Sequence, residues 1–454
     1  MQAYIDAIRG TELVRRTGRV RRLFGLSVEA EGPHASIGEM CEIRGASGDT
    51  LHAEVIGLRD GCTVLMPYGK LSGLHAGCEV VATGRAPQVP VGADLLGRVL
   101  NAFGEPLDGK PAPAARETRP LKAQPLNPLE RPRISEVLET GVRSIDTMLT
   151  LGRGQRVGVF SGSGVGKSSL LGMIARRITA DVNVIALIGE RGREVREFVE
   201  QHLGEEGLER SVVIVATAEL PALARTRAAY AATAIAEYFR DSGRHVLMMM
   251  DSITRFAMAR REIGLAAGEP PTARGYTPSV FAELPELCER CGTAASGGSI
   301  TALYAVLVEG DDFNEPISDI LRATLDGHIV LSRSLANEGH YPAVDVLQSV
   351  SRLFLDLAER ADRETAAAVL ECLALYERNR QMIDIGAYTK GSNPQLDRAM
   401  EIVPALTRFL RQDVAETTSR AEALKRLGGV LNGVTSGVTS GITSGAMKRP
   451  GAPG

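Results

Sequence analysis

The sequence has no run of apolar residues long enough to cross a membrane. Its longest strongly apolar stretch, residues 300–308, is about half the length that a membrane helix needs. The first ten residues lack the continuous apolar core of a signal peptide. The six cysteines are spread along a long chain, which is typical of reduced thiols rather than of a disulfide framework. We therefore expect a cytoplasmic protein with reduced cysteines.

An excess of charge of one sign is also missing. The 52 Lys and Arg residues nearly balance the 55 Asp and Glu residues, and the formal net charge of -3 disfavours a protein that binds polyanions over its whole surface. The chain does have length and apolar content, with 454 residues of which 44% are hydrophobic. Such a chain can form roughly two to four domains of 150 residues each.

Four types of sequence follow one another along the chain. Up to about residue 90, short β-branched segments alternate with Gly- and Asp-containing turns, which predicts a small β-barrel. Prolines are frequent in residues 90–150, so this segment must be extended. From residue 151 to about residue 341, apolar strands alternate with helices, which is typical of a parallel sheet covered on both faces. Beyond residue 351, apolar residues recur at helical spacing.

These patterns predict an α/β protein with additional domains on either side of its sheet. We expect an N-terminal β-barrel in residues 1–90, a nucleotide-binding domain in 91–350 and a C-terminal helical domain in 351–430. The last segment, 431–454, contains a Gly-Val-Thr-Ser repeat. Such repetition cannot form a core, so we expect a flexible tail.

A phosphate-binding loop is the most specific motif in the chain. The apolar residues 157–160 are followed directly by Ser161, Gly162, Ser163, Gly164, Val165, Gly166, Lys167, Ser168 and Ser169. In such a loop, glycines let consecutive backbone N–H groups face the phosphates, Lys167 reaches the β- and γ-phosphate oxygens, and the Ser168 hydroxyl binds Mg²⁺. Ser161 replaces the usual first glycine and is small enough for the turn. The motif predicts a nucleotide hydrolase.

Two acidic residues follow two other apolar runs. Residues 184–188 lead to Glu190, and residues 246–250 lead to Asp251. Both runs are expected to be buried parallel strands, which would deliver the carboxylates to the edge where open α/β sheets bind ligands. Glu190 is our candidate for activating the attacking water. Asp251 is our candidate for holding Mg²⁺ through a water molecule.

Further motifs extend this interpretation to nearly the whole chain. The chain resembles the catalytic subunits of rotary ATPases, and among them most closely the ATPases of bacterial type III protein export. The blocks that carry the resemblance are residues 91–100, 189–194, 275–279, 326–333 and 341–345. The glycine arrangement of the phosphate loop and the block 309–316 resemble the flagellar branch. The resemblance implies a RecA-like ATPase core, ATP and Mg²⁺ as cofactors, and ATP hydrolysis coupled to the export of flagellar proteins.

The resemblance also implies roles for Tyr341 and Arg352. Tyr341 would stack on adenine, and the alternative is a core tyrosine at a strand end. Arg352 would be an arginine finger that enters the nucleotide site of a neighbouring subunit, where a guanidinium contributes about 10³ to 10⁵ in rate. Its alternative is a surface salt bridge. The acidic candidates have structural alternatives too, because Glu190 could pair with a neighbouring arginine and Asp251 with Arg255.

The partners implied by the resemblance are those of a homohexameric ring at an export gate. They are a regulator of the N-terminal segment, a stalk protein in the pore, export-gate proteins and chaperone–substrate complexes, with the ring peripheral at the inner membrane. No nucleic acid is expected. Residues 1–90 contain ten basic residues, ten acidic residues and three aromatic residues, whereas a barrel that binds single strands needs a positive groove with stacking rings.

Four related functions remain as alternatives. The chain could serve the injection apparatus instead of the flagellum, or it could be the catalytic subunit of a rotary ATP synthase. A Rho-like nucleic-acid motor shares the order of barrel and ATPase core. A non-catalytic ring subunit would resemble this chain but would lack the carboxylate at Glu190.

Overall fold

The computed structural model describes residues 15–45, 48–115, 117–308, 310 and 312–439. Contacts within the chain define two compact units. The first unit comprises Met1–Ile134, Arg153–Ser163 and Ala180–Asp326, and the second comprises Ser135–Gly152, Gly164–Thr179 and Gly327–Gly454. Within the described residues, no helix is sufficiently long and apolar to span a membrane.

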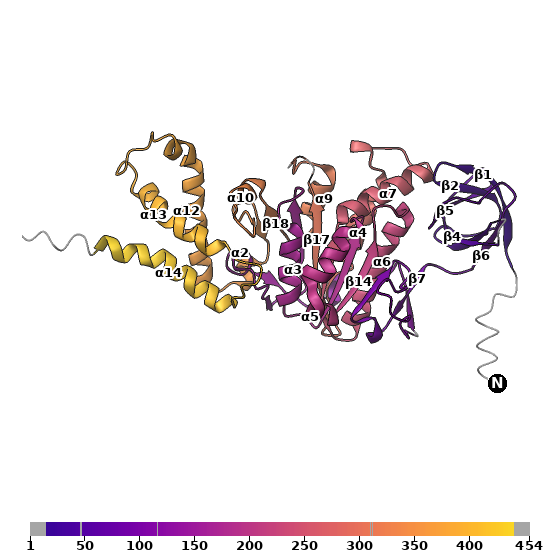
Figure 1. The fold of residues 1–454 in the computed structure, drawn as a ribbon, viewed down its shortest axis with the longest axis horizontal. Coiled ribbons are helices and arrows are strands. Elements are labelled where there is room, and N and C mark those ends of the chain that lie inside the picture. Colours follow the sequence, from indigo (N-terminus) through magenta and orange to yellow (C-terminus); the bar gives the residue numbers. More distant parts are fainter. Residues whose placement is uncertain (1–14, 46–47, 116, 309, 311, 440–454) are drawn as a thin grey trace, which may run out of the picture. The chain divides into compact units, whose positions relative to one another are not determined.

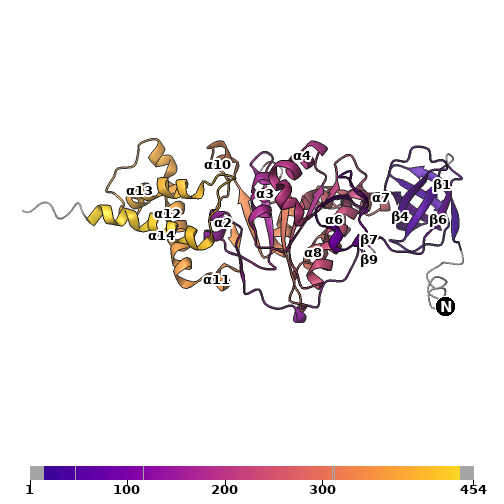
Figure 2. The same ribbon diagram turned by 60° about the horizontal axis from the view of Figure 1, so that its bottom comes forward.

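The first unit begins with a closed antiparallel barrel in the order β1-β2-β5-β4-β3-β6 (Figures 1 and 2). Alternating apolar side chains fill its interior, where Val28, Ala30 and Ile43 are fully buried. The small barrel predicted from the sequence is therefore confirmed. Its strands are β1 (Thr17–Phe24), β2 (Ser27–Glu31), β3 (Met40–Arg44), β4 (Thr50–Arg59), β5 (Cys62–Pro67) and β6 (Glu79–Ala82).

A parallel sheet forms the rest of this unit. Its strands follow the order β12-β17-β15-β13-β14-β8. Strands β13 and β14 are buried along their whole length, which explains the continuous runs of Val, Ile, Leu and Ala in residues 184–188 and 212–216. The strands are β8 (Arg98–Asn101), β12 (Arg156–Ser161), β13 (Val182–Ile188), β14 (Ser211–Ala216), β15 (His245–Asp251) and β17 (Ser299–Leu307), and the short β16 (Gly292–Thr293) pairs with β17.

Helices α6 and α7 pack against this sheet and against each other. Helix α7 begins after Ser252, whose hydroxyl accepts a hydrogen bond from the Arg255 N–H, and it ends at Gly268 in the left-handed conformation. The α/β class predicted from the sequence is confirmed. The helices of this unit are α4 (Gly192–Glu197), the π-helical turn Phe198–Leu203, α5 (Gly204–Glu209), α6 (Ala222–Asp241), α7 (Ile253–Ala267), α8 (Pro278–Glu289) and α9 (Pro316–Thr324).

The barrel packs directly on helices α6 and α7. Met66 and Tyr68, at the end of β5, share an apolar cluster with Leu223 of α6 and Ile263 of α7. The Tyr68 ring meets the Phe103 ring edge-on at 5.1 Å between centroids. In the proline-rich segment, β7 (Gln88–Val91) pairs with β9 (Glu117–Pro120), so this part of the chain is extended, as predicted.

The second unit contains the helical C-terminal region predicted from the sequence. Helices α12, α13 and α14 pack on one another and on α2. Its elements are β10 (Val137–Leu138), α2 (Arg143–Met148), β11 (Leu151–Gly152), α3 (Lys167–Arg177), β18 (Gly327–Leu331), α10 (Arg333–Asn337), β19 (Val350–Ser351), α11 (Phe354–Leu357), α12 (Arg360–Asp384), α13 (Pro394–Leu410) and α14 (Arg420–Thr439). The expected tail, 431–454, overlaps the end of α14, and residues 440–454 lie outside the described residues.

Candidate functional site

The phosphate-binding loop follows β12 directly, as the sequence predicts. The division between the two units falls within this loop, between Ser163 and Gly164. Gly164 and Gly166 have φ values of 78° and 88°, a conformation that favours glycine. Gly166 is the N-cap of α3, so Lys167 and Ser168 occupy the first turn of this helix. A helix start preceded by left-handed glycines presents backbone N–H groups to an anion.

The ring of Tyr341 lies against this loop, within the second unit. A Cβ atom added to Gly166 would lie 3.3 Å from two carbons of the Tyr341 ring. The residue is 45% exposed, so the ring retains an open surface, and its backbone carbonyl accepts a hydrogen bond of 2.9 Å from Gln412 N. The alternative of a buried core tyrosine is therefore excluded. The structure brings together two predicted site residues that are far apart in sequence.

Glu190 lies just beyond the carboxyl end of β13, within the first unit. The intervening Gly189 has φ 70°, and a Cβ atom there would lie 2.9 Å from Cβ and Cγ of Arg255. The Glu190 carbonyl accepts a hydrogen bond of 3.1 Å from Ala218 N, which holds the backbone at this edge. In the following turn, Nη1 of Arg191 lies 3.8 Å from Oε1 of Glu194.

Asp251 is the last residue of β15, the strand next to β13. Its register partner in β13 is Leu187, three residues before Glu190. Both acidic candidates therefore stand at the carboxyl ends of adjacent parallel strands, where the sequence predicts them. Asp251 is 3% exposed, whereas Glu190 is half-buried. The two carboxylates at this edge therefore lie in different environments, since Asp251 is shielded from solvent and Glu190 is partly accessible to it.

The same edge includes the start of the phosphate-binding loop. Ser161 of β12 pairs in register with Leu307 of β17, and Met250 of β15 pairs with Tyr304 of the same strand. The residues Ser161, Gly162 and Ser163 therefore leave the sheet at the edge where Glu190 and Asp251 lie. Within the first unit, the structure brings these five predicted residues to one edge of the sheet.

Arg352 lies in the second unit, directly after the β18–β19 pair. Ser351 pairs in register with Gly327, and α11 begins two residues after Arg352. The Arg352 side chain is exposed. This position on a short, anchored strand end suits a residue that acts beyond its own subunit.

Sequence reasoning missed the contacts that support this edge. The Thr254 hydroxyl, at the start of α7, accepts a hydrogen bond of 2.9 Å from Leu307 N at the end of β17. The stem of Arg255 fills the space over Gly189. No sequence pattern predicts these contacts, because each joins segments that are separated by more than 50 residues.

Cys288 and Cys291 have the spacing of half a zinc site, but their surroundings are those of core residues. Both are fully buried, and burial raises the pKa of the Cys291 thiol to about 11. The Cys291 sulfur lies 3.3 Å from the Tyr304 hydroxyl. In the described part of the chain, no group of three or more His, Cys, Asp or Glu residues could hold a metal ion. The predicted Mg²⁺ site is of a different type, because it uses one hydroxyl, that of Ser168, and one carboxylate, that of Asp251.

Three family models match the chain in the order of its domains. The beta-barrel domain of the ATP synthase alpha/beta family matches residues 20–84, and the nucleotide-binding domain of the same family matches residues 141–351. The C-terminal domain of the type III secretion ATPase EscN matches residues 358–429. The matches cover the barrel, the sheet region and the C-terminal helices.

Two curated relatives match nearly the full length. The flagellum-specific ATP synthase of Bacillus subtilis (strain 168) is 53% identical over 428 residues, covering 94% of this chain and 98% of that protein. The type 3 secretion system ATPase of Xanthomonas euvesicatoria is 48% identical over 417 residues, covering 92% of this chain and 94% of that protein.

Solved structures show the same fold. The assembled ATPase EscN of the type III secretion system of enteropathogenic E. coli has a TM-score of 0.87 and 43% identity, covering 91% of this chain and all of that chain. The structure of EscN in complex with its central stalk EscO has a TM-score of 0.84 and 42% identity, with the same coverage of both chains. Together with the phosphate-binding loop and the two carboxylates, these matches establish that the chain belongs to the ATP synthase alpha/beta family and is an ATPase of its type III protein export branch.

Proposed function

We propose that this chain hydrolyses ATP to energise the export of flagellar proteins, and that Glu190 activates the attacking water. The observation that carries the catalytic part of the proposal is the placement of Glu190 and Asp251 at the ends of adjacent strands, on the edge where the phosphate-binding loop starts. ATP hydrolysis needs a phosphate cradle and a carboxylate for the water, and this edge supplies both types of group.

The loop would hold the triphosphate. Backbone N–H groups around Gly164 and Gly166 would contact phosphate oxygens, and the first turn of α3 would add the positive end of its dipole. The Lys167 ammonium would bind β- and γ-phosphate oxygens. Tyr341, whose ring lies against Gly166 and is partly exposed, would stack on the adenine.

The oxygen donors for Mg²⁺ would be the Ser168 hydroxyl and the Asp251 carboxylate. Both are hard oxygen ligands of the type that this ion prefers, and a buried carboxylate can hold one of its water ligands. When bound, the ion neutralises charge that develops on the phosphate oxygens. The carboxylate of Glu190 would orient the attacking water and accept its proton as the new P–O bond forms and the bond to ADP breaks.

Arg352 would complete the site of a neighbouring copy. A guanidinium placed on the developing phosphoryl charge requires an exposed arginine on an anchored segment, and Arg352 meets both conditions. We propose a homohexameric ring in which each interface forms one site. The solved relative EscN is described as assembled, and a second structure contains its central stalk, which supports a ring with a stalk partner.

The relatives include both branches: flagellum-specific ATP synthases match this chain at identities from 44% to 54%, and type 3 secretion system ATPases match it at 48% and 49%. The flagellar part of the proposal therefore rests on the glycine arrangement of the phosphate-binding loop and on the block 309–316. The ring would act in the cytoplasm, peripheral at the inner-membrane export apparatus. There it would meet export-gate proteins, a regulator of its N-terminal segment and chaperone–substrate complexes. Deletion of the gene should abolish motility, and motility that persists in the deletion strain would contradict the flagellar assignment.

The catalytic proposal is tested by Glu190→Gln, which keeps the side-chain shape and removes the charge. We expect kcat to fall by about 10² to 10⁴ because the water loses its activating carboxylate, while nucleotide affinity is retained. Phosphate release and equilibrium binding of a fluorescent ATP analogue measure the two quantities. Glu194→Gln is the matched control, since Glu194 is an exposed carboxylate on the following helix. Equal kcat in Glu190→Gln and Glu194→Gln would remove Glu190 from the mechanism.

A further inference from the structure

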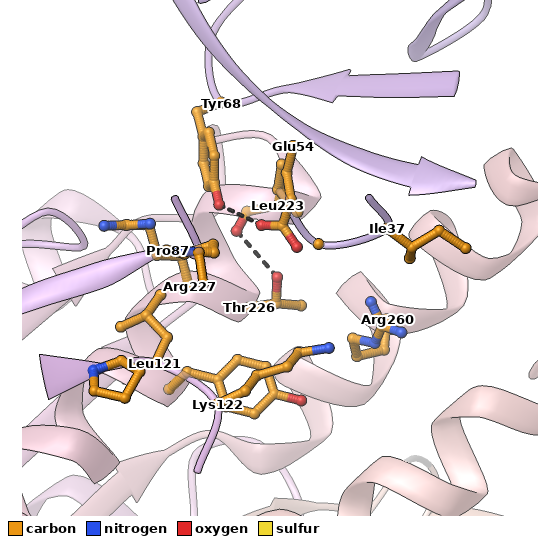
Figure 3. Close-up of a pocket in the computed structure, with 14 residues that line it drawn as sticks. Ile37, Glu54, Tyr68, Pro87, Leu121, Lys122, Leu223, Thr226, Arg227 and Arg260 are labelled. Carbon is orange, nitrogen blue, oxygen red and sulfur yellow. Dashed lines mark hydrogen bonds between the residues drawn. The ribbon is translucent and has the colours of Figure 1, made fainter. Parts of the chain in front are cut away.

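A cavity of about 200 Å³ lies in the first unit, at the junction between the barrel and helices α6 and α7. Figure 3 shows Glu54 and Tyr68 on the barrel side of this cavity and Lys122 on the opposite side, with Arg260 beside it. Glu54 belongs to β4, Leu223 and Arg227 belong to α6, and Arg260 belongs to α7. No residue of the phosphate-binding loop contributes to its wall.

Most of the cavity wall is apolar. Ile37, Pro87, Leu121 and Leu223 line it together with the ring of Tyr230. A buried cavity of about 150 Å³ is sufficient for benzene. A volume of 200 Å³ therefore admits one six-membered ring with a small substituent.

The charged side chains of the wall are mostly cationic. Lys122, Arg227 and Arg260 line the cavity, whereas Glu54 is the one acidic residue among its lining residues. Glu283, outside the lining, accepts hydrogen bonds from Arg260 and from the Tyr230 hydroxyl, and it lies 4.0 Å from the Lys122 ammonium. The single carboxylate of Glu283 thus compensates the charge of two cations on this side of the cavity.

Arg227 lacks a carboxylate among its hydrogen-bond partners. It is 5% exposed, and its guanidinium donates to two neutral carbonyl oxygens, those of Ala102 and Gln88. Its guanidinium carbon lies 4.2 Å from the centroid of the Phe103 ring and 5.4 Å from that of Tyr68. Among the described residues, Nη1 of Arg227 and Nε of Arg260 have no hydrogen-bond partner.

Glu54 offsets this positive charge only in part. The Tyr68 hydroxyl donates to it at 2.6 Å. Burial raises the pKa of Glu54, and the Tyr68 hydrogen bond and the surrounding cations oppose this shift. As a single carboxyl group, Glu54 can compensate at most one of the three cations in the wall.

We propose that this cavity binds a small carboxylate carried on a single aromatic ring. The carboxylate would pair with Lys122 and Arg260, and the ring would fill the apolar space beside Leu121 and Leu223. The ligand would contact the barrel and helices α6 and α7 at once. Its binding would therefore stabilise the packing of the barrel on these helices by mass action, separately from nucleotide binding.

The probe is benzoate, titrated into the full-length protein without nucleotide and followed by calorimetry and by ligand-observed NMR. Its neutral counterpart, benzamide, has almost the same shape. We expect saturable one-site binding of benzoate that is about tenfold tighter than that of benzamide, because only the carboxylate pairs with the cations. No saturation with benzoate, or equal affinity for the two compounds, would overturn the proposal.

Two variants locate the site. Lys122→Met keeps the side-chain length and should weaken benzoate binding up to about fivefold, the upper end for an ion pair of an exposed lysine. Lys70→Met is the matched control, since Lys70 is an exposed barrel lysine outside the cavity wall, and it should change nothing. Ala86→Phe places a ring at an exposed position of the wall and should abolish binding. Unchanged ATP turnover would show that both cavity variants fold, and unchanged benzoate affinity in both would place benzoate elsewhere.

Discussion

Position 189 requires a glycine, both because of its backbone conformation and because a neighbouring side chain leaves no space for a Cβ atom. Its φ of 70° is unfavourable for any residue with a Cβ atom, and that atom would lie 2.9 Å from Cβ and Cγ of Arg255. These Arg255 atoms are next to the backbone and cannot move far without displacing α7. The residue therefore fixes how the chain turns from β13 toward Glu190.

Gly189→Ala should destabilise the protein by about 2 to 4 kcal/mol, because left-handed strain and overpacking add. It should also lower kcat, since Glu190 follows directly. The control is Gly61→Ala, at φ 74° in the β4–β5 turn, where no atom lies within 4 Å of the added Cβ. This control should cost only about 1 to 2 kcal/mol of strain and leave kcat unchanged. Urea unfolding followed by circular dichroism measures both variants, and equal losses would show that the Arg255 contact is unimportant.

The positions of Glu190 and Asp251 could be predicted because each follows an unbroken apolar run that forms a strand. Once two runs are parallel strands of one sheet, their carboxyl ends meet at one edge without further information. The contact between Gly166 and Tyr341 has no such local origin. It depends on tertiary packing between segments about 175 residues apart, so in the sequence Tyr341 could be given a role only by family resemblance.

At the scale of elements, a buried ion pair joins α6 to the end of α8. Nε and Nη2 of Arg290 donate to the Glu237 carboxylate at 2.9 and 2.6 Å, and Nη1 donates to Leu121 O. The two side chains are 2% and 7% exposed. Leu121 also lines the cavity beside the barrel, so this pair holds part of that wall in place.

Glu237→Gln removes the negative charge and leaves Arg290 buried without a counter-ion. We expect a loss of about 3 to 5 kcal/mol in the free energy of unfolding, the usual cost of breaking a buried pair on one side. Glu200→Gln is the matched control, because its 2.8 Å pair with Arg196 is 56% and 77% exposed. It should cost less than about 0.5 kcal/mol. If urea unfolding gives equal losses for the two variants, the Arg290 pair is not structurally important.

The elements themselves were predicted most accurately where periodicity is strong. The barrel follows from short β-branched segments separated by turn residues, the buried strands from continuous apolar runs, and the long helix α12 from a period-3.6 apolar pattern. Strand β8 could not be assigned in this way. It lies in the proline-rich segment, and it becomes an edge strand only by pairing with β14, more than 100 residues later. The cavity between the barrel and α6 also depends on tertiary packing.

At the scale of the whole molecule, the proposed interface site makes a prediction that no monomeric enzyme shares. Glu190→Gln lacks the water-activating group, and Arg352→Ala lacks the proposed finger, so each variant alone should be inactive. In a mixed ring, an Arg352→Ala subunit can supply an intact Glu190 while its neighbour, a Glu190→Gln subunit, supplies an intact Arg352. Random assembly from equal amounts makes about one quarter of the interfaces complete in this way. Phosphate release should therefore reappear on mixing and rise with protein concentration.

A mixture of Glu190→Gln with the double variant is the control and should stay inactive, because no interface is complete. If the first mixture is also inactive while cross-linking shows that mixed oligomers form, Arg352 does not act in a neighbouring subunit.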